Sequence, residues 1–337
     1  MVNKLKRLAG QKMNSLLCVL LLVVLLLLPL IVRGTYYRHI LIFTLMYIVL
    51  AQAWNLIGGY VGQIALGNAV FFALGAYTST LLVMRGNVTP WVGMWVGGFV
   101  AAAVALALGS LFLKLKGHYF AMATIAVGEI MRLWFSNWKF VGGAQGFSLP
   151  LKRSSWYYMQ WQSKIPYYYI ILIIAVLTTL LVRTLDKAKY GSYAKAVNQD
   201  EISARSRGVN AFRLKQISFC LCAFITALVG TFYAQYILYI SPQSMLLLQT
   251  SILVAIIPIV GGVGTVWGPV LGAIFIFPLT EFLRAQLGGQ AVGLNYIFFG
   301  LAVIFVVMVE PLGLYALLQK MKEIITRVGR SHASPEH

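Results

Sequence analysis

The sequence predicts an all-α integral membrane protein with about ten transmembrane helices and a short cytoplasmic helix between two of them. Of its residues 60% are hydrophobic and only 10% are charged, whereas about 25% are charged in soluble domains. Its apolar runs are long enough to cross a bilayer, and in lipid each run must satisfy its own backbone hydrogen bonds, which favours helices. The alternation typical of an outer-membrane barrel is absent from these runs.

The first apolar run, Ser15–Val32, follows a basic leader. Its length matches the roughly 18–20 residues that a bilayer core requires and exceeds that of a signal-peptide core. No small-x-small cleavage pattern follows it, so we expect a retained first span. The other runs predicted to span are Ile40–Leu56, Ile64–Val83, Pro90–Leu113, Tyr119–Phe135, Tyr167–Val182, Gln216–Tyr239, Met245–Val260, Val266–Leu283 and Gly293–Val309.

The positions of Lys and Arg predict the orientation. The net charge of +19 comes from basic residues placed between apolar runs. This is the pattern of a topology signal, and it argues against nucleic acid as a partner. With an even number of spans, both termini lie in the cytoplasm. We therefore expect a cytoplasmic basic N-terminus (1–14), a permease domain (15–310) with a cytoplasmic loop at 183–215, and a cytoplasmic tail (311–337). The loop Asn137–Pro166, which also carries basic residues, is the exception on the outer side.

The charged segment YAKAVNQDEISARSRGVNAFRLK, in the loop 183–215, contains helix signals. Asn198 as N-cap and Glu201 three residues later form a capping-box pattern, and Gly208 suits a left-handed residue after a helix end. Asp200 and Arg205 complement the helix dipole. Together these signals predict a helix over Gln199–Arg207. Asn210 offers a second N-cap just before the apolar run of the seventh span.

A helix of about nine residues is too short to be stable alone in water, so something must pack on it. Ala204 and Gly208, with Glu201 one turn back, give it a face of small side chains. The segment is therefore predicted to dock a cytoplasmic partner. A solvated, positively charged loop that only fixes the topology is the alternative. The candidate docking residues are Asn198, Asp200, Glu201, Ala204, Arg205 and Gly208.

Polar residues and glycines inside the apolar runs are the candidates for the translocation pathway. Glu129 and Arg132 are spaced i, i+3, as are Glu281 and Arg284, so each pair can neutralise itself in lipid. Such a pair either lines a polar path or holds helices in register. Glycine blocks serve close helix packing or mark a substrate route, and the segments around them are either re-entrant or simple turns. The candidates are Gly58, Gly59, Gln63, Asn68, Glu129, Arg132, Gly261 and Gly262.

The stretch AVNQDEISARSRGVNAFRLKQISF resembles the cytoplasmic coupling segment of the LivM family of ABC importer permeases. Asn198, Gln199 and Ser203 depart from the family pattern there. NLIGGYVGQIALGNAVFFALGAYTSTLL, LKGHYFAMATIAVGEIMRLWFSNWKFVGGAQG, GGVGTVWGPVLGAIF and EPLGL are similar to further blocks, in the family's order. Asn68 stands where the family often has His. The residues that match the coupling pattern are Ala196, Val197, Asp200, Glu201, Ala204, Gly208, Val209 and Lys215.

The resemblance implies a permease subunit in the bacterial inner membrane that forms half of a pathway for branched-chain or hydrophobic amino acids. It also implies three partners: separate ATPase subunits that bind ATP and Mg²⁺, a homologous second permease chain, and a periplasmic or extracellular solute-binding protein. The chain itself has no G-x-x-x-x-G-K-[ST] loop and no expected cofactor. A permease for urea or short amides remains an alternative, as does a stand-alone channel or secondary carrier. A membrane-embedded enzyme would need clustered catalytic acids, but the whole chain has only 8 Asp and Glu residues.

Overall fold

The structure is a computed structural model that describes residues 25–32, 34–115, 117–150 and 154–287, and scattered positions between 297 and 321. In this part of the chain, seven helical segments are long and apolar enough to cross a membrane. A further helix, α5, is of similar length but less apolar, since it carries Glu129 and Arg132. The long helices are α2 (Thr35–Gly58), α3 (Asn68–Gly86), α4 (Pro90–Phe112), α5 (His118–Asn137), α6 (Ile165–Lys187), α9 (Ala211–Ile237), α11 (Leu248–Gly261), which follows the short α10 (Pro242–Met245), and α12 (Gly268–Leu287).

The predicted spans from the second to the ninth each coincide with one of these helices, which confirms the all-α membrane class. Of the predicted first span, only 25–32 is described, and 25–31 is helical. Most of the predicted last span, Gly293–Val309, lies outside the described residues, as do the basic leader and most of the tail. The total of about ten spans therefore stays a prediction.

The core of the bundle forms around α2, α3 and α9, whose side chains are largely buried. Small residues bring α3 and α9 into close contact. A Cβ atom built on Gly75 would lie 2.0 Å from the carbonyl oxygen of Ala227, and one on Gly230 would lie 2.0 Å from that of Phe72. Such close backbone contact is the usual role of glycine between membrane helices. By contrast, α4 exposes Val92, Trp95 and Phe99 on the periphery.

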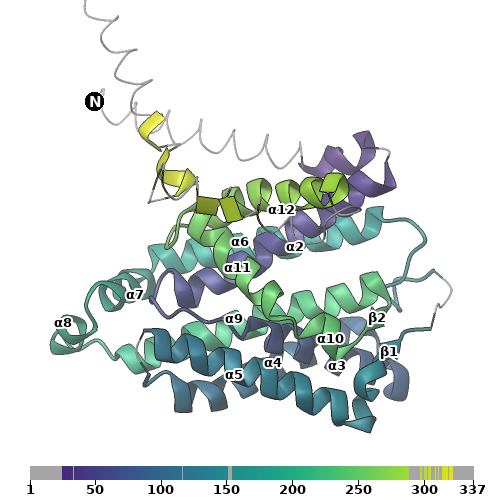
Figure 1. The fold of residues 1–337 in the computed structure, drawn as a ribbon, viewed down its shortest axis with the longest axis horizontal. Coiled ribbons are helices and arrows are strands. Elements are labelled where there is room, and N and C mark those ends of the chain that lie inside the picture. The colour runs from purple at the N-terminus through teal and green to yellow at the C-terminus, as the bar shows by residue number, and fades with distance from the viewer. Residues whose placement is uncertain are drawn as a thin grey trace, which may run out of the picture.

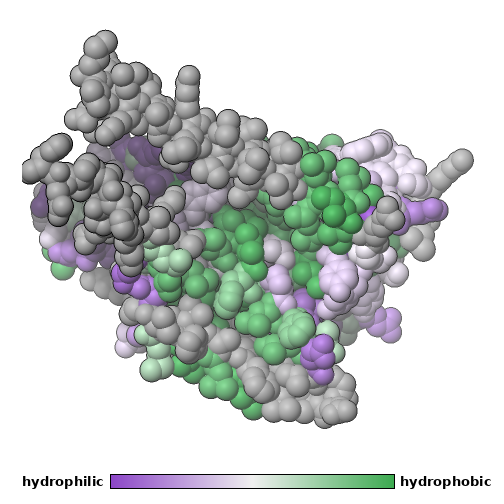
Figure 2. All heavy atoms as spheres, turned by 90° about the horizontal axis from the view of Figure 1, so that it is seen from above, coloured by the Kyte–Doolittle hydropathy of each residue, from purple (hydrophilic) through white to green (hydrophobic). Residues whose placement is uncertain are grey.

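The connections between helices gather at two opposite ends of the bundle (Figure 1). One end holds α7 (Lys189–Gln199) and α8 (Glu201–Ser206). The other holds two short 3₁₀ turns, η1 (Lys139–Val141) and η2 (Gly143–Gln145), and strands β1 (Phe147–Ser148) and β2 (Tyr239–Ile240), which pair antiparallel with Phe147 opposite Ile240. Figure 2 shows hydrophobic side chains over the middle of one face and hydrophilic ones toward the ends, as expected for a membrane-spanning bundle.

The predicted loop 183–215 is shorter and more helical than the sequence indicated. The sixth span continues to Lys187, and α9 begins at Ala211. Between them the chain forms α7. This helix was not predicted from the sequence, because Ala188 at its start offers no side-chain cap. The predicted N-cap of the following span is confirmed: the side chain of Asn210 accepts a hydrogen bond from the N–H of Arg213 at 3.0 Å.

Candidate coupling surface and translocation residues

The break between α7 and α8 falls at Asp200, not at Asn198. Asp200 has extended backbone angles, and its carboxylate accepts hydrogen bonds from the N–H of Ile202, at 3.0 Å, and from the Ser203 hydroxyl. These bonds hold the pKa of Asp200 below its ordinary value. The predicted start of the helix, with Asn198 as N-cap and Glu201 completing a capping box, is therefore wrong, since Asn198 lies within α7. Either residue has the side chain of an N-cap, and the sequence pattern selected the wrong one.

Glu201 anchors α8 to the bundle. Its carboxylate accepts from the ammonium group of Lys215 at 2.9 Å and from the guanidinium of Arg205 at 2.5 Å. The Lys215 side chain is only 4% exposed and extends from the first turns of α9. Burial raises the pKa of the Glu201 carboxyl, but the two cations outweigh burial and hold it below its ordinary value. Glu201 is therefore ionised at neutral pH.

Only part of the predicted face of small side chains is available to a partner, because Gly208 is exposed but Ala204 is not. Ala204 is buried against the bundle, and the Glu201 carboxylate is already paired with the Lys215 ammonium group. The apolar residue that α8 exposes is Ile202, which is 70% exposed, beside exposed Ser203, Arg205 and Ser206. Gly208 has φ of +84°, so its prediction as the left-handed residue after the helix is confirmed. Ile202 was not predicted as an exposed residue, because an isolated apolar residue in a charged segment is typical of a buried contact.

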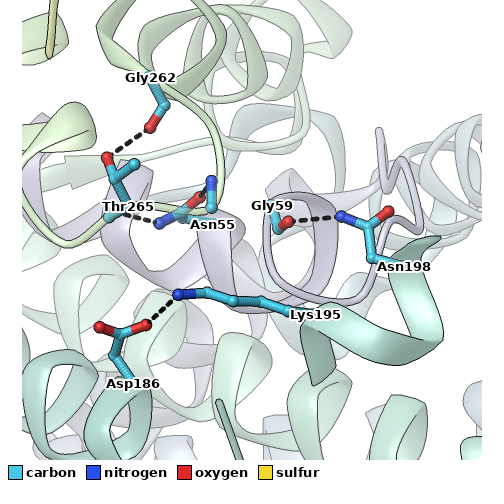
Figure 3. A network of polar contacts seen from close by, with 8 residues as sticks. Asn55, Gly59, Asp186, Lys195, Asn198, Gly262 and Thr265 are labelled. Atoms are coloured by element: carbon cyan, nitrogen blue, oxygen red, sulfur yellow. Dashed lines mark hydrogen bonds and ion pairs between the residues drawn. The ribbon is translucent and has the colours of Figure 1, made fainter. Parts of the chain in front are cut away.

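The two glycine segments meet at the same end of the bundle as α7 (Figure 3). Asn55, in the last turn of α2, joins them: its amide donates to the carbonyl oxygen of Thr265 at 2.8 Å, and its side-chain oxygen accepts from the N–H of Gly264 at 2.9 Å. The Asn198 amide donates to the carbonyl oxygen of Gly59 at 3.0 Å. Asn55 lies one turn before the first glycine block. That position is the feature of the sequence from which its contact could have been expected.

Close packing accounts for several of the candidate glycines. A Cβ atom on Gly59 would lie 2.7 Å from the backbone nitrogen of Gly264, and one on Gly261 would lie 1.9 Å from the carbonyl oxygen of Gly268. Gly58 lies against the indole of Trp54. Gly262 has φ of +127°, a conformation that other residues rarely adopt, and caps α11. These positions hold the backbone of the two segments together.

After α2 the chain folds back along the last turn of that helix. The Trp54 indole donates to the carbonyl oxygen of Ala65 at 2.7 Å, and the N–H of Leu66 donates to the Thr124 hydroxyl at 3.0 Å. Gln63, in this segment, is buried, and its side-chain oxygen has no hydrogen-bond partner within the described part of the chain.

Asn68, the first residue of α3, is 2% exposed, and its amide nitrogen has no partner among the described residues. It borders two small cavities of about 10 Å³ each, one of them also lined by Thr226 and Ser251. A cavity of this size has room for about one water molecule. These two cavities are therefore each too small for a solute as large as an amino acid.

Glu129 and Arg132 lie apart from these buried residues, on the exposed side of α5. They form the expected i, i+3 pair, with the guanidinium Nε of Arg132 donating to Glu129 at 2.9 Å. Glu281 and Arg284 form the second expected pair at 2.8 Å. The structure thus separates the predicted translocation residues into the packed glycines, the buried Gln63 and Asn68, and the pair on α5.

Comparison with known proteins gives the family context. A family model described as the permease component of branched-chain amino acid transport systems matches residues 36–307. The high-affinity branched-chain amino acid transport system permease protein LivM of Escherichia coli (strain K12) is 30% identical over 275 residues, which cover 75% of this chain and 64% of that protein. LivM of Salmonella typhimurium is 30% identical over 264 residues, covering 72% of this chain and 62% of that protein.

The chain thus spans a little under two thirds of the length of these two relatives. The fructose import permease protein FrcC of Rhizobium meliloti is 27% identical over 146 residues, which cover 42% of this chain and 40% of that protein. No solved structure matches the chain. Proteins named for amino-acid transport and for sugar import are therefore both similar to parts of this sequence.

Proposed function

We propose a function on the premise that this chain belongs to the family of permease components of branched-chain amino acid transport systems, whose model matches residues 36–307. The chain forms half of the translocation pathway of an ATP-driven importer for branched-chain or other hydrophobic amino acids, in a bacterial inner membrane with both termini in the cytoplasm. The match over most of the chain is the observation that carries this proposal. A soluble binding protein delivers the substrate, and separate subunits bind ATP.

The substrate is tested by uptake. Proteoliposomes that contain this chain, a second permease, the ATPases and the binding protein should accumulate labelled leucine only when ATP is supplied. Excess unlabelled isoleucine or valine should compete, whereas urea, a short amide and fructose should not. Uptake without ATP would support a channel or secondary carrier, and competition by urea would support the amide permeases.

The exposed side of α8 supports the docking of an ATPase at this end of the bundle. Ile202 projects from a helix that Glu201 and Lys215 hold in place, so its aliphatic side chain is positioned to serve as an anchor in a pocket of a partner. Replacing Ile202 by Glu places a charge in that contact. We expect ATPase co-purification and ATP-driven leucine uptake to fall at least about tenfold while the chain still inserts.

The matched control for Ile202→Glu is Tyr157→Ser. Tyr157 is also about half exposed but lies at the opposite end of the bundle, where its hydroxyl donates to the carbonyl oxygen of Asn87. ATPase co-purification should be unchanged in this control. Normal ATPase binding and uptake by Ile202→Glu would contradict the docking role of α8.

The exposed pair on α5 supports a second permease chain as a partner. Charged residues at membrane depth almost always face a protein interior or a water-filled path, because exposing them to lipid is costly. On α5, Glu129 and Arg132 are instead accompanied by exposed Ile130 and Trp134. A partner that covers this side of α5 removes the cost of exposing the ion pair to lipid, and the pair then lies at the interface or on the path between the two chains.

Disulfide cross-linking tests this contact. A cysteine at Ile130, with cysteines scanned along the membrane helices of the co-expressed second permease, should give a cross-linked heterodimer. The control is a cysteine at Leu177 on α6, which is similarly exposed (61% against 64%) on a helix without a charged pair in its middle. Cross-linking through Leu177→Cys alone would assign the interface to α6.

A further inference from the structure

A pocket of about 260 Å³ lies beside α8. Its lining comes from three places: the residues that follow α4, helix α8, and the first turns of α9. The lining residues are Leu113, Lys114, Glu201, Arg205, Phe212 and Lys215.

The pocket carries more positive than negative charge. Three cations line it against one carboxylate, that of Glu201, which Lys215 and Arg205 already neutralise. Lys114 is exposed and forms no ion pair with any described residue. Lys114 and the exposed part of Arg205, whose side chain is 60% accessible, therefore lack a full counter-charge. An anion that enters the pocket meets donors on two sides.

The depth of the pocket matches the boundary of a membrane. Leu113 and Lys114 directly follow the span that ends at Phe112, while Phe212 and Lys215 lie in the first turns of the span that begins at Ala211. Leu113 and Phe212 provide apolar walls beside the cations. Three residues before Lys114, on the membrane side, Leu111 is 67% exposed on the periphery of the bundle. Cationic groups at a span end with exposed apolar surface next to them suit a molecule with an anionic head and an acyl tail.

We propose that this pocket binds the phosphate headgroup of an anionic phospholipid in the leaflet on the α8 side. The phosphate lies between Lys114 and Arg205, and an acyl chain follows the exposed surface of α4 past Leu111. A lipid in the pocket would contact both Arg205 on α8 and Lys114 after α4. It would therefore add a second contact between α8 and the bundle, beside the pair of Glu201 with Lys215. This consequence, that anionic lipid stiffens the coupling surface, rests on the proposed function, whereas lipid binding itself does not.

Native mass spectrometry of the purified full-length chain tests the binding. The chain is freed of lipid in detergent and then given equal amounts of phosphatidylglycerol and phosphatidylcholine. We expect phosphatidylglycerol to be retained in preference. Lys114→Gln and Arg205→Gln should each lower the ratio of bound phosphatidylglycerol to phosphatidylcholine about fivefold. Both residues are at the surface, so these variants should fold. Lys139→Gln, which removes an exposed cation at the opposite end in η1, is the matched control and should leave the ratio unchanged.

Three results would overturn the proposal. Equal retention of the two lipids, or the same loss in Lys139→Gln, would mean that only general surface charge acts. Displacement of phosphatidylglycerol by millimolar inorganic phosphate would assign the pocket to a soluble anion. An unchanged lipid ratio in Lys114→Gln, together with weaker ATPase co-purification, would assign Lys114 to a carboxylate of the docking protein. Because the lipid ratio is measured without any partner, failure of the importer function would leave this result unaffected.

Discussion

Lys215 is almost fully buried at the start of α9, and its ammonium group holds Glu201 and with it α8. Replacing Lys215 by Met keeps the length of the side chain but removes the cation. Breaking one partner out of a buried ion pair costs about 3–5 kcal/mol. Here we expect about 2 kcal/mol, because Glu201 is partly exposed and keeps Arg205. Chemical unfolding in detergent micelles measures the loss, and faster tryptic cleavage at Arg205 and Arg207 should accompany it.

A second substitution separates the ion pair from simple packing. In the double variant Glu201→Leu, Lys215→Met no buried charge is left unpaired, since Arg205, which also loses Glu201, is largely exposed to solvent, so most of the lost stability should return. The exposed pair of Lys195 with Asp186, 2.7 Å apart, serves as the comparison. Lys195→Met should cost less than about 1 kcal/mol. Equal losses for Lys195→Met and Lys215→Met would mean that burial of Lys215 contributes nothing to the hold on α8.

At the scale of elements, the contact between α9 and α3 limits which side chains the two helices tolerate. Gly230→Val places a Cβ atom 2.0 Å from the carbonyl oxygen of Phe72, so the helices must separate. We expect a loss of about 3 kcal/mol or more, measured by thermal unfolding in detergent. Gly128→Ala in α5 is the control, since nothing lies within 4 Å of its added Cβ atom. It should leave stability unchanged or raise it by up to about 1 kcal/mol.

The same scale shows what could be predicted from sequence. Apolar runs located eight helices, and local chemistry located the left-handed Gly208 and the N-cap Asn210, because both depend on neighbouring residues alone. The start of α8 and the place of Ala204 on its exposed face were predicted wrongly. Which of Asn198 and Asp200 caps the helix is decided by the contact between Asn198 and Gly59, 139 positions away in sequence. The inward direction of Ala204 depends likewise on α9.

For the candidate site residues too, local features could be predicted from the sequence and long-range contacts could not. The Glu129/Arg132 pair follows from i, i+3 spacing, so the sequence predicted it, but its exposure on α5 could not be known without the packing of α5. The junction of the two glycine segments through Asn55 joins residues 210 positions apart, and no local pattern encodes that partner.

At the scale of the whole molecule, the two ends differ in basic residues and so define an orientation. Among the described residues, the α8 end carries Lys114, Arg183, Lys187, Lys189, Lys195, Arg205, Arg207, Arg213 and Lys215, whereas the β1–β2 end carries Arg38, Arg85, Lys139 and Lys164. Arg132 and Arg284, each paired with a Glu, lie in the parts of α5 and α12 toward the β1–β2 end. Basic residues near span ends are retained on the cytoplasmic side. We therefore propose that the α8 end faces the cytoplasm, where an ATPase would be available.

Labelling with a membrane-impermeant maleimide tests this orientation. In a variant whose Cys18, Cys220 and Cys222 are replaced by Ala, a cysteine at Ser206 on α8 should react only in inside-out vesicles. A cysteine at Tyr157, near the β1–β2 end, should react only from the outside of intact spheroplasts, since both positions are exposed but lie at opposite ends. The opposite pattern would place α8 outside the cell, away from ATP. It would exclude the proposed docking of an ATPase on Ile202, whereas reaction of both cysteines from one side would contradict the arrangement of the two ends across a membrane.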